Sequence, residues 1–464
     1  MVVTLVVAVC AGHTLEIQPM ARASLPAALL ALLAIPLLFS SDSGGVHRPA
    51  LLIGLLAVAY LVFRAFLSPV WDLARRDLVL ICTAWITILA VPGILRSRTG
   101  FGIIVLGLVG IVLANFGYAV AQASRDTGPF FLNHPQNADS DRSVGLFGHP
   151  NILAGFLAVA VPLLAGSLLR FQNHFVRWGI ALACLLGGVT VFLSQSRGGM
   201  LALLVGLSVS SALACSRHLK RGADKSRSVI VILAVGVLLL VAGVLVMNRI
   251  WFERGMGPSF DRAVGSDIRL DLFGIALAQW YENPVLGGGS RTFTYEAIRL
   301  WNPMSIARGM GNAEMAHCDY LQMLAEYGVI GLLLVMAFVA VLSVSGVFRM
   351  MEQDSGEDWL LDCGALGGIA AALAHAAFDF TLHALPVTVI VAIAFGTILA
   401  NRPAPGPGRR PLMAVAGLSV LVVAGVLAVG THREWRTMGD FFGFERAVVL
   451  WGLREAELED LTAI

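Results

Sequence analysis

The chain alternates between long apolar runs and short polar connections. Apolar segments long enough to cross about 30 Å of hydrocarbon each predict a membrane-spanning helix. They lie at 24–39, 49–67, 78–95, 101–121, 150–169, 176–194, 199–215, 228–248, 327–348, 360–380, 384–400 and 411–430. Residues 1–12 form another apolar run, too short for a complete span and without the basic start of a signal peptide. The pattern predicts an all-α polytopic membrane protein with about 12 or 13 transmembrane helices.

Composition agrees with this class. Hydrophobic residues make up 57% of the 464 residues and charged residues only 13%, whereas soluble domains carry about 25% charged residues. The charges are confined to short connections, so no nucleic-acid partner is expected. Of the six cysteines, only Cys318 stands outside the apolar runs or their borders, and no CxxC spacing occurs. We therefore expect no disulfide framework, no metal and no other cofactor.

The basic residues indicate an orientation. The chain's two lysines, Lys220 and Lys225, lie in one short arginine-containing loop, and further arginines occur in 401–410. Such clusters mark cytoplasmic connections, and the four predicted spans between them return the chain to the same side. Alternation then places on the outer side 122–149, the turns at 195–198 and 381–383, the large polar interruption at 249–326 and the residues after 430.

Two features qualify this scheme. The loop 68–77 carries Arg75 and Arg76, yet alternation places it outside. The interruption 249–326 is long enough to be a partly helical loop with chemistry of its own. The chain divides into N-terminal transmembrane helices (1–130), a membrane domain that includes this loop (131–430) and a short helical tail (431–464).

The unusual polar residues collect on the predicted outer side. Arg197 follows a serine at the end of a span, and His149 precedes Pro150, which suits the first turn of a helix. His375, Asp379 and His383 are spaced by four, which predicts one shared helix face. Ionisable residues inside a span are costly and suggest function. The remaining candidates lie in the large loop: Arg269, His317 and the run Gly287, Gly288 and Gly289.

Each candidate also has a structural explanation. Arg197 can be an interfacial arginine whose stem snorkels, His149 a helix cap, and His317 an ordinary loop histidine. His375 can be a satisfied interhelical residue, and Asp379 a partner for a buried arginine or histidine. The three glycines can form a plain loop or an anion-binding nest of backbone N–H groups. The prediction that all of these residues lie on the same side of the membrane is stronger evidence for a site than any one of them.

Together these residue types suit glycosyl transfer. A guanidinium is permanently charged and can fork onto phosphate oxygens. A neutral histidine can accept the proton of a sugar hydroxyl. Arginines that hold a diphosphate would also offset the charge that develops on the leaving group. The sequence has no DxD-type nucleotide–metal motif, as expected when the donor is a lipid-linked glycan.

Five segments between residues 140 and 400 resemble the O-antigen ligase and polymerase superfamily of bacterial envelope proteins. The resemblance implies a metal-independent, inverting glycosyltransferase of the inner membrane that uses undecaprenyl-diphosphate-linked glycan at the periplasmic face. It implies His317 as the base and Arg197 and Arg269 as diphosphate ligands. Asp319 stands where the family often has Asn; it joins His149, Asp379, His383 and the glycine run as candidate supporting residues. The segments are GLFGHPNILAGFLA, LSQSRGGMLALLVG, RLDLFGIALAQWYENPVLGGGSRTF, AHCDYLQMLAEYGVIGLL and HAAFDFTLHALPVTVIVAIAFG.

The leading hypothesis is a ligase-like enzyme that moves a glycan from a lipid-linked donor to a glycan or lipid acceptor. A polymerase of lipid-linked repeat units differs only in its acceptor, which product length would reveal. A small-anion transporter would instead use the His375, Asp379 and His383 face as a pathway, without a glycan donor. A non-catalytic envelope scaffold is the fourth alternative.

Overall fold

A computed structural model describes residues 48–123, 142–221, 268–300, 314–352 and 358–400. Every regular element in these ranges is helical, and eight helices are long and apolar enough to cross a membrane. A ninth apolar helix, α16 (Leu385–Ala400), is shorter. The protein is therefore an all-α, multi-pass membrane protein, as predicted. The predicted spans at 24–39, 228–248 and 411–430, the run 1–12 and the tail lie outside the described residues.

Nine of the predicted spans have a counterpart among these helices. The eight long ones are α3 (Arg48–Phe66), α4 (Trp71–Arg96), α5 (Arg98–Ala123), α6 (Pro150–Ser167), α7 (His174–Leu193), α8 (Arg197–Arg221), α14 (Asp319–Glu352) and α15 (Trp359–Ala376). Between the spans are α11 (Ile268–Glu282), α12 (Phe293–Arg299) and the 3₁₀ turns η2 (Gly145–Phe147), η3 (Leu168–Arg170) and η5 (Thr381–His383).

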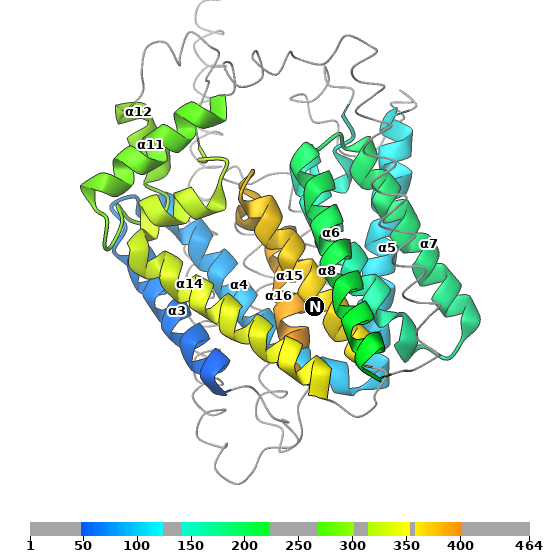
Figure 1. Cartoon of the computed structure of the whole chain (residues 1–464). Helices are drawn as coiled ribbons and strands as arrows, with labels where there is room; N and C mark the ends of the chain where they lie inside the picture. Colours follow the sequence, from blue (N-terminus) through cyan, green and yellow to red (C-terminus); the bar gives the residue numbers. More distant parts are fainter. Residues whose placement is uncertain (1–47, 124–141, 222–267, 301–313, 353–357, 401–464) are drawn as a thin grey trace, which may run out of the picture.

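Helix α6 lies at the centre of one half of the bundle. All of its residues are buried, and α15 packs against both α6 and α8. The α6–α15 crossing is close because a Cβ on Gly364 would lie 2.3 Å from Pro162 O and 2.9 Å from Gly166 Cα. Small residues at such crossings let helix backbones approach in a membrane. On the other side of α15 and α16, Figure 1 shows α3, α4 and α14 as a second group.

Helix α14 begins earlier than predicted. It starts at Asp319, eight residues before the predicted span, and Gly328 (φ 68°) interrupts the helical geometry. The kink separates a short first segment from the long membrane helix (Figure 1). The polar residues Gln322 and Glu326 made this first segment resemble a loop, and their burial explains the difference. The N-terminal turns of α14 thus belong to the predicted interruption 249–326.

The predicted helix face of His375, Asp379 and His383 is wrong. Helix α15 ends at Ala376, not at residue 380. The N–H groups of Phe378 and Asp379 both donate to His375 O, at 2.9 and 3.1 Å. The Asp379 carboxylate then accepts from the next N–H, at 2.9 Å. These bonds close a turn, so the three side chains reach different partners.

The predicted outer connections meet at one end of the bundle. The turn between α3 and α4 lies against the segment 287–290: Arg64 Nη2 donates to Gly287 O at 2.8 Å, and Ser68 Oγ donates to Ser290 O at 2.7 Å. Arg142 bonds Ser194 O in the turn before α8. Alternation therefore grouped these segments correctly, but the predicted loop 68–77 is shorter than expected, because α4 already begins at Trp71 and Arg75 and Arg76 lie in its first two turns.

Candidate functional site: a histidine–aspartate pair beside three arginines

His317 lies in a bend directly before α14, with a positive φ of 52°. Its Nδ1 is 3.3 Å from Asp379 Oδ1, and its ring meets Phe380 edge-on, with 4.7 Å between centroids. The contact with Asp379 is long and is not aligned as a hydrogen bond. Histidine and aspartate are nevertheless close enough to pair electrostatically, and catalytic hydrogen bonds often tighten when substrate binds. The structure thus brings together two residues 62 positions apart in the sequence.

Asp379 is suited to remain ionised. Its side chain is buried, and burial raises the pKa of a carboxyl group. The neighbouring His317 and the N–H of Phe380 outweigh burial, so the pKa of Asp379 lies below its ordinary value. A buried carboxylate that remains charged can hold a histidine in one orientation and stabilise its protonated form.

Arg142 joins this pair from the segment before α6. Its Nε donates to Ser194 O at 3.2 Å, and its Nη2 donates to Asn151 Oδ1 at 2.9 Å. Burial lowers the pKa of Arg142; Asp379 opposes this effect, whereas Arg269 and Arg197 add to it. Arg142 is thus within electrostatic reach of Asp379, Arg269 and Arg197. The predicted arginines Arg197 and Arg269 are therefore brought together, and Arg142 is a third that the sequence argument missed.

His149 caps α6, which is the structural alternative of its two predicted roles. Its Nδ1 accepts the N–H of Asn151 at 3.3 Å, and Pro150 occupies the first turn. Burial is the main cause that lowers the pKa of His149 to about 4. Nδ1 is the acceptor, so the neutral ring carries its proton on Nε2. Its ring also lies 5.7 Å from that of Phe380, which places Phe380 against both His149 and His317.

His375 serves mainly to pack helices. Its Nδ1 lies 2.8 Å from Thr381 Oγ1, and a Cβ on Gly155 of α6 or Gly198 of α8 would lie 3.1 and 3.5 Å from its ring. Its Nε2 is buried without a hydrogen-bond partner among the described residues. His375 is thus an interhelical residue at the crossing of α6, α8 and α15.

Asp319 and His383 form a second pair. His383 Nδ1 is 2.9 Å from Asp319 Oδ1, and the N–H of Leu382 donates to Oδ2 at 3.2 Å. Burial lowers the pKa of His383, but its bond to Asp319 outweighs that effect and the pKa is raised. The two pairs, His317–Asp379 and Asp319–His383, both join the start of α14 to the turn after α15.

The glycine run is a packing element, and the predicted anion nest is not formed. The N–H groups of Gly287, Gly288 and Gly289 donate to Asn283 O, Ala325 O and Glu326 O at 2.8–2.9 Å. Gly287 has φ 74°, and a Cβ there would lie 2.5 Å from the backbone of Glu326 and Gly328. Glycine is needed for this close crossing, and its N–H groups are already used.

A buried acidic cluster beyond the second pair also escaped the sequence argument. Asp77 Oδ1 accepts from Arg291 Nε at 2.6 Å, and its Oδ2 accepts from Ser290 Oγ at 2.8 Å and Tyr327 OH at 3.0 Å. Donor atoms of Asp77, Glu326 and His383 lie within 4.8 Å of one another, a spacing that could hold a metal ion. The guanidinium of Arg291 already supplies the positive charge to Asp77.

Neither Arg142 nor Asp77 could be identified as a site residue from its local sequence. Arg142 stands three residues before the GLFGHPN segment, in a connection with other arginines and aspartates nearby. Asp77 follows Arg75 and Arg76 and resembled a loop residue. The partners of Asp77 are more than 200 residues away, so only the fold identifies it.

Comparison with known families agrees with the geometry. Residues 180–336 match the family model described as O-antigen ligase. This stretch contains Arg197, Arg269 and His317, whereas Arg142 and Asp379 lie outside it. No curated protein matches the chain. The chain is therefore a multi-pass membrane protein in which residues 180–336 are similar to the O-antigen ligase family, in agreement with the resemblance of the sequence motifs.

Proposed function

We propose that this protein transfers a glycan from an undecaprenyl-diphosphate carrier to an acceptor hydroxyl at the periplasmic face of the inner membrane. The observation that carries the proposal is the His317–Asp379 pair, with Arg142 within electrostatic reach of Asp379 and Arg197 and Arg269 within reach of Arg142. Positive charge beside a general base is what displacement of a diphosphate leaving group requires. The family match supports this class of membrane glycosyltransferase.

In this proposal His317 is the base. Asp379 faces its Nδ1, which leaves Nε2 for the acceptor. The acceptor hydroxyl gives its proton to Nε2, and its oxygen attacks the anomeric carbon. The bond from that carbon to the diphosphate oxygen breaks, so the configuration inverts and the bonding electrons leave with the carrier. Asp379 then stabilises the imidazolium.

The arginines would hold the leaving group. Arg197 begins α8, and Arg269 lies in the first turn of α11, so two helices far apart in the sequence supply them. Arg142 is fixed by Ser194 and Asn151, which orients its guanidinium before substrate arrives. Guanidinium groups are suited to phosphate because they fork onto two oxygens. This chemistry assigns catalysis to side chains without a metal.

His149 and Phe380 would support the base. Phe380 contacts the ring of His317 and restricts it. His149 is neutral, so it adds no positive charge that would oppose protonation of His317. A polymerase would use the same groups, with a second lipid-linked glycan as acceptor.

The test is a transfer assay on purified protein with a synthetic polyprenyl-diphosphate glycan. We expect His317→Ala to lose at least about 100-fold in rate, the lower end of general-base contributions. Arg197→Ala and Arg269→Ala should also lose transfer, with Arg299→Ala, an exposed arginine of α12, as the matched control. Full activity of His317→Ala at normal protein level would exclude it as the base.

A further inference from the structure

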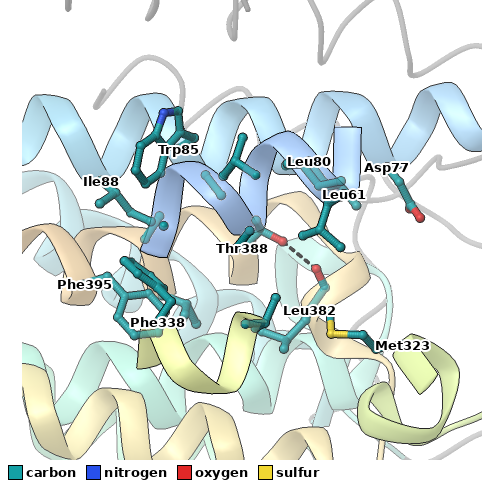
Figure 2. Close-up of a pocket in the computed structure, with 18 of the residues that line it drawn as sticks. Leu61, Asp77, Leu80, Trp85, Ile88, Met323, Phe338, Leu382, Thr388 and Phe395 are labelled. Atoms are coloured by element: carbon teal, nitrogen blue, oxygen red, sulfur yellow. Dashed lines mark hydrogen bonds between the residues drawn. The ribbon is translucent and has the colours of Figure 1, made fainter. Parts of the chain in front are cut away.

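A mostly apolar cavity of about 240 Å³ lies between α3, α4, α14 and α16. Its walls are small and aliphatic residues, and its two ends differ. Figure 2 shows Trp85, Phe338 and Phe395 at one end and Asp77 and Met323 at the other. The cavity therefore has an aromatic end and an acidic end.

The acidic end is lined by five polar residues: Asp77, Asp319, Glu326, Tyr327 and His383. Most of their acceptor atoms are used, because Asp77 bonds Arg291, Ser290 and Tyr327, and Asp319 bonds His383.

Glu326 is the exception. Its Oε1 accepts from Gln322 Nε2 at 3.2 Å and from the N–H of Phe293 at 3.4 Å. Its Oε2 is buried and has no hydrogen-bond partner among the residues that the structure describes. Glu326 itself is 1% exposed. An unpaired buried acceptor is costly, so this atom marks the place where a ligand donor would be stabilised.

We propose that this cavity binds the hydrocarbon chain of an amphiphile whose polar end is a hydrogen-bond donor, a hydroxyl or an ammonium group, placed at Glu326 Oε2. The apolar walls suit the chain. The three carboxylates of the acidic end repel a phosphate, whereas they attract a donor. Phosphate chemistry is provided for elsewhere, beside Arg142 and His317.

The dimensions fit a chain that lies along α4. Asp77 and Ile88 both line the cavity, and 11 residues of helix separate them by about 16 Å at 1.5 Å per residue. The aromatic end therefore lies deeper along the spans than the acidic end. An amphiphile in this cavity would have its headgroup near the end of the bundle that holds Asp319 and its chain parallel to the helices.

A metal ion fits less well than an organic donor. Asp77, Glu326 and His383 have the spacing of metal ligands. However, both carboxylate oxygens of Asp77 are already bonded, to Arg291, Ser290 and Tyr327, which leaves few ligand atoms for a divalent ion. Among the described carboxylate oxygens at this end, Glu326 Oε2 is a buried one without a partner, which suits one hydrogen bond.

The test uses photoreactive probes of equal chain length that end in an alcohol, an amine or a phosphate. Purified protein in detergent is irradiated with each probe, and labelled residues are mapped by mass spectrometry. We expect the alcohol or the amine to label α4, α14 and α16 at cavity residues, and the comparison of the two identifies the donor. The phosphate probe should leave these residues unlabelled. Equal labelling by all three probes would overturn the proposal, because the headgroup would then have no role.

Two variants locate the site. Ala84→Phe adds a ring to the cavity wall and should abolish labelling there, while Ala59→Phe on the exposed face of α3 should not. Glu326→Gln keeps the shape but removes the negative charge, and the probe concentration for half-maximal labelling should rise about tenfold or more. Glu296→Gln, a carboxylate of α12, is its control. Unchanged labelling in Ala84→Phe, or Mn²⁺ binding that needs Glu326 without any probe labelling, would refute the lipid site. These readouts do not depend on glycan transfer.

Discussion

Asp379→Asn tests whether the histidine and the aspartate act as one unit. The substitution preserves the shape of the side chain and an oxygen that can still accept the N–H of Phe380. It removes the negative charge that faces His317 Nδ1 at 3.3 Å. In the proposed reaction this charge matters most when the imidazolium has formed. The loss should therefore appear in the rate of transfer rather than in donor binding.

The expected magnitude follows from the geometry. Hydrogen bonds to charged groups contribute about 1.5–3 kcal/mol, which corresponds to about 10- to 150-fold in rate. The burial of Asp379 favours the upper part of this range, and the long, poorly aligned contact favours the lower part. We expect a loss of about 30-fold, smaller than that of His317→Ala because the base itself remains.

The assay is single-turnover transfer with saturating donor, for Asp379→Asn, His317→Ala and the double variant. If Asp379 acts through His317, the double variant should transfer no more slowly than His317→Ala alone. Multiplied losses would show that Asp379 acts independently of His317 and would refute the pairing. Thermal stability of each variant identifies any loss caused by misfolding.

Three further predictions concern the surroundings of the pair. Arg142→Ala should slow transfer about tenfold or more, and Arg142→Lys should slow it nearly as much, because an ammonium cannot keep the hydrogen bonds to Ser194 and Asn151 while it faces a phosphate. Equal activity of Arg142→Lys and the wild type would contradict the role of the guanidinium group. Asp77→Ala should destabilise the fold by about 3–5 kcal/mol by leaving Arg291 buried without its carboxylate partner, whereas Glu282→Ala at an exposed pair should leave thermal unfolding nearly unchanged. The pKa of His149 is about 4 in the folded protein and about 6.5 when unfolded, so the unfolded state takes up the proton first as pH falls. Stability should drop by about 2 kcal/mol at pH 5, and His149→Asn, which keeps a capping side chain, should remove this slope; an unchanged slope would show that another group titrates.

Hydropathy predicted the described spans well because the membrane imposes a simple rule. A run of apolar residues must form a helix to satisfy its backbone in lipid, and α5, α6 and α7 differ from their predicted bounds by only a few residues. The rule fails where a helix carries polar residues that are buried by neighbours. Gln322 and Glu326 at the start of α14 are such residues, since their partners are a methionine, two backbone N–H groups and each other.

The end of α15 shows the converse error. The four-residue spacing of His375, Asp379 and His383 is correct for a helix, but the segment closes into a turn because Asp379 accepts a local N–H. Aspartate competes with the helix in this way, and nothing in the periodicity reveals which conformation wins. The three residues still lie at one end of the bundle. Their predicted position on one side of the membrane was therefore a better guide to the site than their predicted position on one helix face.

The crossed histidine–aspartate pairs give a reason for aspartate at position 319, where the family resemblance leads us to expect Asn. Asp319 uses both carboxylate oxygens, one for His383 and one for the N–H of Leu382. An asparagine could still accept the N–H of Leu382, but it carries no negative charge that would pair with a protonated His383. The carboxylate is therefore matched to a histidine at position 383, and its charge is taken up there rather than by His317. His317 therefore pairs with Asp379. Asp319 instead holds the turn that carries Asp379, through the N–H of Leu382, and does not compete for the proton on His317.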